Sequence, residues 1–312
     1  MSNLVEVLKS SGSTSFTRDE VKALAKENGI KTTELKAFLQ DPANRQERGR
    51  YGVVITQAKP VQTETEEQIA VRIRDRFEIL ESLSSSAASG ETRALIVSGP
   101  PGLGKTHTVT NTVEALCRDN VVVTLSGSAS AIGLYRGLSD TRSKGSVLIL
   151  DDCDAVFFDL ASLSLLKAAC DSTKKRILRW SSEYHFGGDA IDKCFEYHGT
   201  VIFITNIDFD AELARRSKLT PHLEALMSRA HYLTLGIRTK KDFIVRIIDV
   251  IKVMYNKGEF GKDEAVDAIT FIKDHADSLR ELSCRTAIKI TQLRKSLPDD
   301  WERVARITMC KE

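Results

Sequence analysis

The residues whose types and spacing best suit chemistry begin with the stretch GPPGLGKT, residues 99–106. An apolar run typical of a strand precedes it, and a pattern typical of a helix follows it. Glycines let backbone N–H groups turn inward around an anion, and the N-terminus of the new helix adds a positive dipole end. Lys105 adds a flexible positive charge, and Thr106 adds a hydroxyl that can bind Mg²⁺. This stretch predicts a site for the phosphates of a nucleotide.

The predicted nucleotide contacts cover the whole loop and the next residue. They are Gly99, Pro100, Pro101, Gly102, Leu103, Gly104, Lys105, Thr106 and His107.

A pair of carboxylates follows a second apolar run, in SVLILDDCD. A carboxylate at the end of a strand beside the phosphate loop can hold Mg²⁺, and the next one can polarise an attacking water. We assign Asp151, with Thr106, to the metal and Asp152 to the water. A simple turn residue is the alternative for either aspartate.

A third segment, GTVIFITNID, is a strand pattern that ends in Thr205 and Asn206. A neutral amide there can orient the lytic water between the γ-phosphate and Asp152. Asparagine is also common in turns, so the order of the three segments along the chain is what favours the catalytic interpretation.

The three segments, in this order, resemble the AAA+ family of ATPases. The matching residues are Gly99–Thr106 for Walker A, Val147–Asp152 for Walker B and Thr200–Asn206 for sensor 1, and the resemblance spans residues 69–312. It implies the family fold and the use of Mg-ATP (the cofactors ATP and Mg²⁺) by a homo-oligomer in a ring or helix. Asp152 departs from the usual glutamate, so hydrolysis that is slow or waits for a partner is an open alternative. The Asp-Asp ending is also similar to the initiator and helicase-loader branch, which points toward DNA replication.

The same resemblance implies roles for two arginines. Arg229, in EALMSRAHYLTL, looks like the arginine finger of clamp-loader proteins, which stabilises phosphoryl charge in the neighbouring subunit. Arg215 and Arg216 are competing candidates. In the C-terminal region, Arg285 looks like a sensor 2 residue that contacts nucleotide, with Arg280 as the second choice.

The elements that must position these residues form an α/β pattern. Strand-like runs alternate with helical stretches, which predicts a parallel five-stranded sheet with helices on both faces. A serine-rich stretch, residues 82–92, is expected to be a loop before the first core strand. The predicted strands are 94–98, 121–125, 147–151, 201–205 and 232–235.

Four regions are expected along the chain. They are an N-terminal module at 1–57, a polar linker at 58–68, the nucleotide-binding core at 69–236 and an α-helical lid at 237–312. In the first region, Thr17 and Glu20 fit a capping box at the start of a helix that stops near Gly29.

The N-terminal module is open to two interpretations. Two short helices followed by a basic, β-prone tail suggest a helix-turn-helix or winged-helix unit that binds DNA. Docking on a partner protein or a neighbouring subunit fits equally well. The candidate phosphate contacts are Arg45, Arg48 and Arg50, beside Tyr51.

Two further segments could contact the substrate that the ATPase moves. Residues 174–198 contain two β-prone runs and suggest a hairpin inserted before the Asn206 strand, which either engages DNA or covers the sheet. Tyr135 or Arg136 could contact a substrate threaded through a pore, or Tyr135 could be packed in a helix. The hairpin's candidate DNA contacts are Lys174, Lys175, Arg176, Arg179 and Trp180.

Composition limits the remaining function classes. Lys plus Arg number 45 against 43 Asp plus Glu, a net charge of +2, which argues against a strongly basic nucleic-acid coat. The six cysteines lack a C-x-x-C pair and predict buried thiols in a reducing cytoplasm. No apolar run reaches the roughly 20 residues that span a bilayer, so no membrane contact is expected.

Three functions therefore stay open. The first is a DNA-directed ATPase of the replication or helicase-loader type. The second is an ATPase that remodels a partner protein, and the third is a slow, ATP-gated assembly switch.

Overall fold

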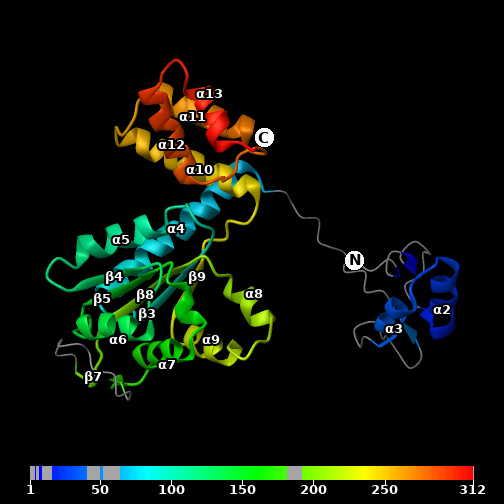
Figure 1. The fold of residues 1–312 in the computed structure, drawn as a ribbon, viewed down its shortest axis with the longest axis horizontal. Helices are drawn as coiled ribbons and strands as arrows, with labels where there is room; N and C mark the ends of the chain where they lie inside the picture. Colours follow the sequence, from blue (N-terminus) through cyan, green and yellow to red (C-terminus); the bar gives the residue numbers. More distant parts are fainter. Residues whose placement is uncertain are drawn as a thin grey trace. The chain divides into compact units, whose positions relative to one another are not determined.

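The computed structural model describes residues 4, 7–8, 16–40, 50–51, 64–180 and 192–311. The chain divides into two compact units, residues 1–63 and 64–312 (Figure 1). Each unit is described by itself.

The N-terminal unit pairs two short helices with a small antiparallel sheet. Strand β1 (Phe16–Thr17) leads into helix α2 (Arg18–Glu27), and α3 (Thr32–Gln40) precedes strand β2 (Arg50–Tyr51), which pairs with β1. The predicted capping box is confirmed, since the Thr17 side chain accepts from the Glu20 N–H and the Glu20 carboxylate accepts from the Thr17 N–H. Arg45 and Arg48 lie outside the described residues. A small apolar core holds the unit together: Leu4, Leu8, Phe16, Val21, Ala25, Phe38, Leu39 and Tyr51.

The second unit is built on the predicted parallel sheet of five strands, in the order β4-β5-β8-β3-β9. All neighbouring strands of this sheet run parallel. The first strand of this sheet along the chain, β3, lies next to the edge, between β8 and β9. The strands are β3 (Ala94–Ser98), β4 (Val122–Ser126), β5 (Val147–Asp151), β8 (Thr200–Thr205) and β9 (His231–Thr234).

Helices cover both faces of this sheet, as the sequence predicts. Side chains alternate along a strand, so neighbouring residues enter different cores. Leu95 and Val97 of β3 face α4 (Glu66–Ala88) and α5 (Lys105–Leu116). Ile96 faces the side covered by α6 (Ala131–Asp140), α7 (Leu160–Ala169) and α9 (Thr220–Met227) (Figure 1). Two short helices, η2 (Asp154–Phe157) and α8 (Phe209–Ala214), follow β5 and β8.

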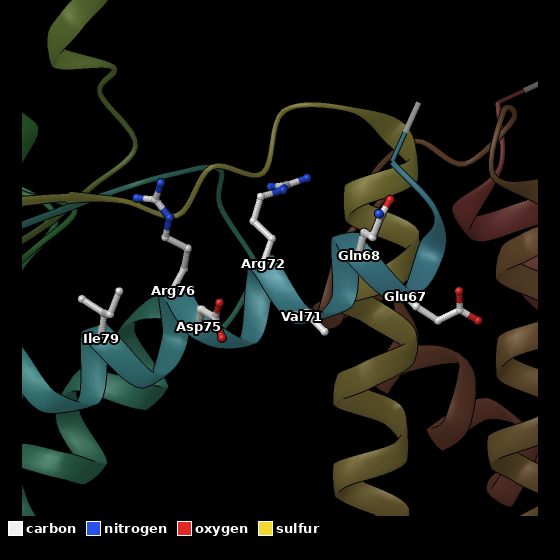
Figure 2. Close-up of a pocket in the computed structure, with 7 residues that line it drawn as sticks. All are labelled: Glu67, Gln68, Val71, Arg72, Asp75, Arg76 and Ile79. Atoms are coloured by element: carbon white, nitrogen blue, oxygen red, sulfur yellow. The ribbon is translucent and has the colours of Figure 1, made fainter. Parts of the chain in front are cut away.

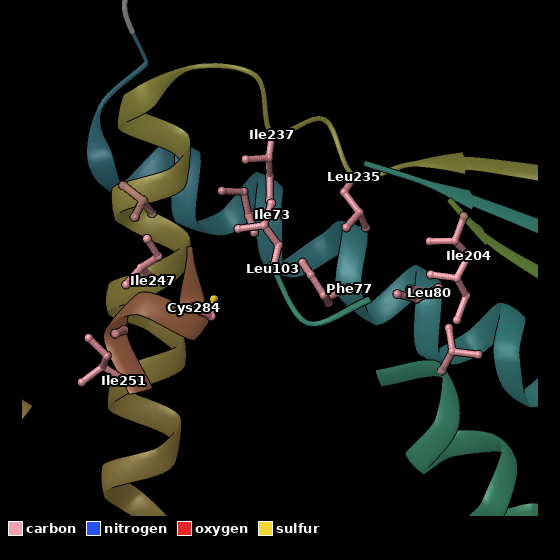
Figure 3. Packing of buried hydrophobic residues seen from close by; sticks show 14 of the residues in the cluster. Ile73, Phe77, Leu80, Leu103, Ile204, Leu235, Ile237, Ile247, Ile251 and Cys284 are labelled. Atoms are coloured by element: carbon pink, nitrogen blue, oxygen red, sulfur yellow. The ribbon is translucent and has the colours of Figure 1, made fainter. Parts of the chain in front are cut away.

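The predicted all-helical lid is confirmed for the described residues after β9. It consists of α10 (Lys240–Asn256), α11 (Lys262–His275), α12 (Cys284–Ser296) and α13 (Trp301–Met309). Figure 3 shows where lid and core meet: Leu103 of the phosphate loop, Phe77 of α4 and Cys284 of α12 belong to one buried cluster. The loop is therefore packed directly against the lid.

Helix α4 also holds the segment that connects β9 to the lid. Arg72 donates to the carbonyl oxygen of Gly236 at 2.8 Å and forms an ion pair with Asp242 at 2.7 Å, while Arg76 donates to the Thr234 carbonyl at 3.0 Å. Figure 2 shows both arginines rising from α4 toward this connecting segment. These bonds fix the entry to the lid relative to the sheet.

Two sequence predictions about α4 are wrong. The linker was expected to extend to residue 68, but the helix begins at Glu66, because Thr65 and Gln68 form a capping box. The serine-rich stretch was expected to be a loop, but α4 continues to Ala88. Ser82 and Ser85 donate to carbonyls one turn back, and Ala87 packs in the core, so the helix buries enough surface to continue.

The predicted hairpin before β8 is present. Strand β6 (Ile177–Arg179) pairs antiparallel with β7 (Cys194–Glu196), and residues 181–191 between them lie outside the described residues. Lys174, Lys175 and Arg179 are exposed.

Arg176 was wrongly assigned to DNA. Its side chain is buried, donates to the carbonyls of Ala169 and Gly199, and lies over the Tyr197 ring at 5.1 Å. It anchors the base of the hairpin, because a buried guanidinium needs such partners.

Tyr135 is likewise a packing residue and does not face a pore. Its ring is fully buried, lies 5.4 Å from that of Trp180 and 5.2 Å from that of Phe195, and its hydroxyl donates to the Asp192 carbonyl at 2.9 Å. The pore hypothesis for Tyr135 is therefore wrong, and the helix-packing alternative is confirmed. Arg136, next to it on α6, is exposed.

Five of the six cysteines are buried free thiols, as expected, and Cys194 on the hairpin is exposed. No helix in the described part of the chain has the length and apolar character needed to cross a bilayer.

Candidate nucleotide-binding site

The phosphate loop lies between the end of β3 and the start of α5. Gly102 and Gly104 adopt positive φ angles of 71° and 94°, a region that side chains disfavour. A Cβ at Gly102 would lie 2.7 Å from the Ser283 Cβ of the lid, so both conformation and space require glycine there. The loop can thus approach phosphates closely while its outer side touches the lid.

Lys105 sits at the centre of the site. Its ammonium nitrogen donates to the carbonyls of Gly99 (2.6 Å) and Pro100 (2.9 Å) and to the Asn206 side-chain oxygen (2.8 Å). Burial lowers the pKa of Lys105 to about 8, and the nearby carboxylates of Asp152 and Asp151 oppose this shift. A buried ammonium beside a glycine loop is well suited to hold phosphate oxygens.

The two predicted magnesium ligands lie together. The Thr106 hydroxyl, in the first turn of α5, donates to the Asp151 carboxylate at the end of β5 at 2.9 Å. Because β5 and β8 are adjacent and β8 borders β3, the strand order brings Asp151 to the phosphate loop. A hydroxyl and a carboxylate at this spacing fit Mg²⁺, which prefers oxygen ligands and keeps several waters.

Asp152 and Asn206 are joined directly across two strands. The Asn206 amide nitrogen donates to the Asp152 carboxylate at 2.9 Å. Asp152 has φ of 52°, unusual for a residue with a Cβ, and its N–H donates to the Ile204 carbonyl at 2.9 Å. The left-handed backbone turns its carboxylate away from the strand and toward Asn206.

The lid contributes its own residues to this pocket. The Cys284 N–H donates to the Gly102 carbonyl at 2.8 Å, which joins the start of α12 to the phosphate loop. Arg285 follows on α12 and lines the pocket, whereas Arg280 is not among the lining residues in the described structure and donates to the Cys310 carbonyl. The lining residues are Pro101, Gly102, Gly104, Lys105, Thr106, His107, Asp152, Asn206, Cys284, Arg285 and Ile288.

The other predicted loop contacts lie beside this lining. Gly99 and Pro100 present their carbonyls to Lys105, and the Leu103 side chain is fully buried in the core.

Arg229 lies outside the pocket of its own chain. It follows α9, pairs with Asp171 at 3.3 Å and donates to the Ala225 carbonyl at 2.6 Å. Of the competitors, Arg215 pairs with Glu212 at 2.6 Å, and Arg216 is exposed with φ of 50°.

Sequence reasoning missed two charged groups near the site. Arg246 of α10 donates to the Leu103 carbonyl at 3.3 Å and lies 3.5 Å from the centre of the Phe77 ring, and burial lowers its pKa. Asp154 accepts from the Thr205 hydroxyl at 2.5 Å, and burial raises its pKa. Asp154 could have been noticed in the sequence, because it lies three positions after Asp151. No sequence signal indicated that a lid helix would bring Arg246 to the phosphate loop.

Together these features define the fold class of the protein. A phosphate loop after β3, carboxylates after β5, an asparagine after β8 and a helical lid, on a sheet of order β4-β5-β8-β3-β9, form a P-loop α/β fold, which is the fold that the AAA+ resemblance of the sequence implies.

Comparison with known proteins gives a family. The chain is 36% identical over 262 residues to an uncharacterized 36.7 kDa protein from the nrdC-mobD intergenic region of Enterobacteria phage T4, covering 81% of this chain and 78% of that protein. The chain belongs to the same family as this phage protein. No family model matches the sequence.

Two solved structures are similar to this chain in fold. One is the RuvB Holliday junction branch migration motor of Thermotoga maritima, with a TM-score of 0.45, 17% identity, and coverage of 75% of this chain and 67% of that one. The other is NtrX of Brucella abortus in complex with ADP, with a TM-score of 0.44, 15% identity, and coverage of 91% and 58%.

Proposed function

We propose that this protein binds and hydrolyses ATP with Mg²⁺. The observation that carries the proposal is the chain of contacts from Lys105 through Asn206 to Asp152, with bonds of 2.8 and 2.9 Å. Its support is that an ammonium, an amide and a carboxylate lie side by side. Hydrolysis of a phosphoric anhydride needs these groups, because its catalysis is mostly positioning and charge stabilisation.

Each residue has a distinct part in the proposed reaction. Lys105 and the loop N–H groups hold the β- and γ-phosphates, and Arg285 contacts them from the lid. Thr106 and Asp151 would hold Mg²⁺, which supplies charge neutralisation on the phosphate oxygens when bound. Asn206 orients the attacking water, and Asp152 accepts a hydrogen bond from it and draws its proton. Asp152 is one methylene shorter than glutamate, and its left-handed backbone favours a carboxylate directed at Asn206.

We assign the remaining catalytic charge to a second copy of the chain. Arg229 is absent from the residues that line its own pocket, within the described part of the chain, yet charge on the γ-phosphate needs a cation. A ring or helical homo-oligomer in which Arg229 reaches the adjacent site would supply it. The ion pair with Asp171 is partly exposed, so releasing the arginine costs about 1 kcal/mol or less.

DNA is the substrate that we assign to the motor. The support is the hairpin of β6 and β7, which presents Lys174, Lys175 and Arg179 to solvent. Exposed cations on or just before a hairpin can contact a phosphate backbone. Residues 1–57 are a second candidate DNA contact.

The experiment that tests the ATPase proposal compares the wild-type chain with two variants. Lys105→Ala is expected to lose Mg-ATP binding, and Asp152→Asn is expected to keep binding and lose turnover. If the wild-type chain binds Mg-ATP but does not hydrolyse it, even with DNA and protein partners present, the slow assembly switch would be the function.

The substrate is tested separately. ATPase rates are measured against single-stranded DNA, duplex DNA and candidate proteins, at low and high salt. Stimulation by DNA that disappears with salt supports the proposal, since phosphate contacts release counterions. Stimulation by a protein alone would instead assign the protein-remodelling function.

A further inference from the structure

Asp154 is a third carboxylate beside the site and has no part in the reaction described above. It begins the short helix η2, three residues after Asp151. It is absent from the residues that line the nucleotide pocket in the described structure, so it does not contact the substrate there. Its one hydrogen-bonded partner described here is Thr205, the last residue of β8.

The Thr205 hydroxyl acts both as a hydrogen-bond donor and as an acceptor, and each partner is a neighbouring residue. It donates its single proton to the Asp154 carboxylate at 2.5 Å, and it accepts from the Ile207 N–H at 3.0 Å. The Thr205 side chain is fully buried, so water does not compete for these bonds. The bond to the Ile207 N–H therefore closes a short turn from residue 205 to residue 207. Asn206 is the residue inside this turn.

A second bond holds the far end of the same turn. The Ser98 hydroxyl of β3 donates to the Ile207 carbonyl at 2.5 Å. Ser98 adjoins the phosphate loop, while Asp154 adjoins the carboxylates after β5. The turn that carries Asn206 is thus held from both strands that flank β8.

We infer that Asp154 is a positioning residue for ATP hydrolysis: through Thr205 it holds Asn206 between Lys105 and Asp152. The inference rests on the proposed ATPase function and adds a residue to it. A carboxylate acceptor makes the bond charge-assisted, roughly twice as strong as a neutral one, so it restrains the turn more firmly than a neutral acceptor would.

The expected effect is on turnover more than on binding. A displacement of about 1 Å at a catalytic group can cost about 10²-fold in rate. Mg-ATP affinity depends mainly on the phosphate loop. Thr205 contacts that loop through its backbone carbonyl, which accepts from the Gly99 N–H at 3.3 Å, and its hydroxyl contacts Asp154 and Ile207 instead. A loss of kcat with an unchanged dissociation constant for Mg-ATP is the signature of this role.

The closing experiment uses the full chain with Thr205→Val, which keeps the shape of the side chain and removes the hydroxyl. We expect kcat to fall about 10- to 100-fold with little change in Mg-ATP affinity. Thr205→Ser restores the hydroxyl and is expected to recover kcat to within about threefold of the wild type.

The matched control is Thr200→Val, on the first residue of the same strand. Thr200 is also buried, and its hydroxyl donates to the Thr92 carbonyl at 3.0 Å. It is expected to lower the free energy of unfolding as Thr205→Val does, by about 1–3 kcal/mol, and to leave kcat unchanged.

Asp154→Ala tests the same bond from the other side and decides the matter if Thr205→Val does not fold. It is expected to lower kcat like Thr205→Val, and the double variant should be no slower than either single one, because the two residues act as a unit. Normal kcat in folded Thr205→Val or Asp154→Ala overturns the inference. A wild-type chain that binds Mg-ATP without hydrolysing it overturns the proposed function itself, and the inference with it.

Discussion

Lys105 and Asn206 lie 101 residues apart in the chain and meet through a hydrogen bond of 2.8 Å between the ammonium nitrogen and the amide oxygen. The same amide donates to Asp152 at 2.9 Å. Asn206 thereby connects Lys105, which we propose holds phosphate, with Asp152, which we propose activates water. Strands β3 and β8 pair directly, so the ends of the two strands bring these residues together.

Asn206→Ala should therefore separate binding from turnover. We expect kcat to fall by about 10²–10³-fold, as for the loss of one oriented donor in a preorganised site, with Mg-ATP affinity nearly unchanged. Steady-state rates and equilibrium titration with Mg-ATP provide the two measurements. Asn256→Ala, on an exposed residue at the end of α10, is the control and should behave as wild type. Normal turnover in Asn206→Ala would remove Asn206 from the mechanism.

Mixing two inactive variants tests whether Arg229 acts on a neighbouring subunit. Arg229→Ala alone should bind Mg-ATP but turn over about 10³-fold more slowly, since an arginine finger contributes about 10³–10⁵. Lys105→Ala cannot bind ATP, yet it keeps Arg229. Mixed with Arg229→Ala, it should restore part of the ATPase rate, because it supplies the arginine to intact sites.

The competing arginines provide the control for this experiment. Arg215→Ala and Arg216→Ala are expected to retain the wild-type rate. If the mixture recovers no ATPase activity and either Arg215→Ala or Arg216→Ala is inactive, the arginine-finger role would belong to the arginine replaced in that inactive variant.

Arg246 should contribute to stability because it joins the lid to the phosphate loop. Its side chain is only 12% exposed, lies over Phe77 and donates to the Leu103 carbonyl. Arg246→Met should lower the free energy of unfolding by about 2 kcal/mol, from the lost cation–π contact and hydrogen bond. Arg246→Lys should not recover it, since an ammonium lacks the planar shape that stacks and donates at once.

Urea unfolding of these variants gives the measurement. Arg294→Met is the control in the same lid, where the arginine pairs with Asp267 nearer the surface and a clearly smaller loss is expected, because exposed ion pairs contribute little to stability. Equal losses for Arg246→Met and Arg294→Met would contradict a special role for the loop contact.

Because of Cys170, the free energy of unfolding should decrease as the pH rises above about 9. Burial raises the pKa of this thiol to about 12, from a usual value of 9.0. Above about pH 9 the unfolded chain loses the proton while the folded chain keeps it, so the stability present below pH 9 is lost as the pH rises toward 12.

Cys170→Ala removes this dependence. The gap in free energy of unfolding between wild type and variant should narrow by about 1 kcal/mol from pH 8 to pH 10, in urea melts with a reductant present. Val156→Ala, a buried truncation without a titrating group, should show the same gap at both pH values. A constant gap for Cys170→Ala as well would show that the thiol titrates equally in both states.

Much of the fold and of the pocket could be predicted because the signals are local. A phosphate loop needs its glycines, lysine and threonine within eight consecutive residues, and strand patterns place Asp151 and Asn206 at strand ends. Helix caps such as the Thr17 and Glu20 pair are local too. Arg285 was chosen over Arg280 from its place at the start of α12, and it lies in the pocket lining.

The predictions that were wrong concern residues whose environment comes from distant parts of the chain. Arg176 and Tyr135 carry polar groups that suit a DNA or pore surface, yet the hairpin and the sheet bury them. The serine-rich end of α4 has the composition of a loop, and its packing against the core keeps it helical.

By itself, the sequence determined the class of site, because phosphate and metal binding depend on residue types at short, fixed spacings. Only the tertiary structure decided which of the many remaining charged side chains serve that site. Arg246 reaches the phosphate loop from the lid, and Asp154 reaches the Asn206 turn across two strands. Such contacts depend on strand order and helix packing, which bring together residues that no spacing along the chain relates.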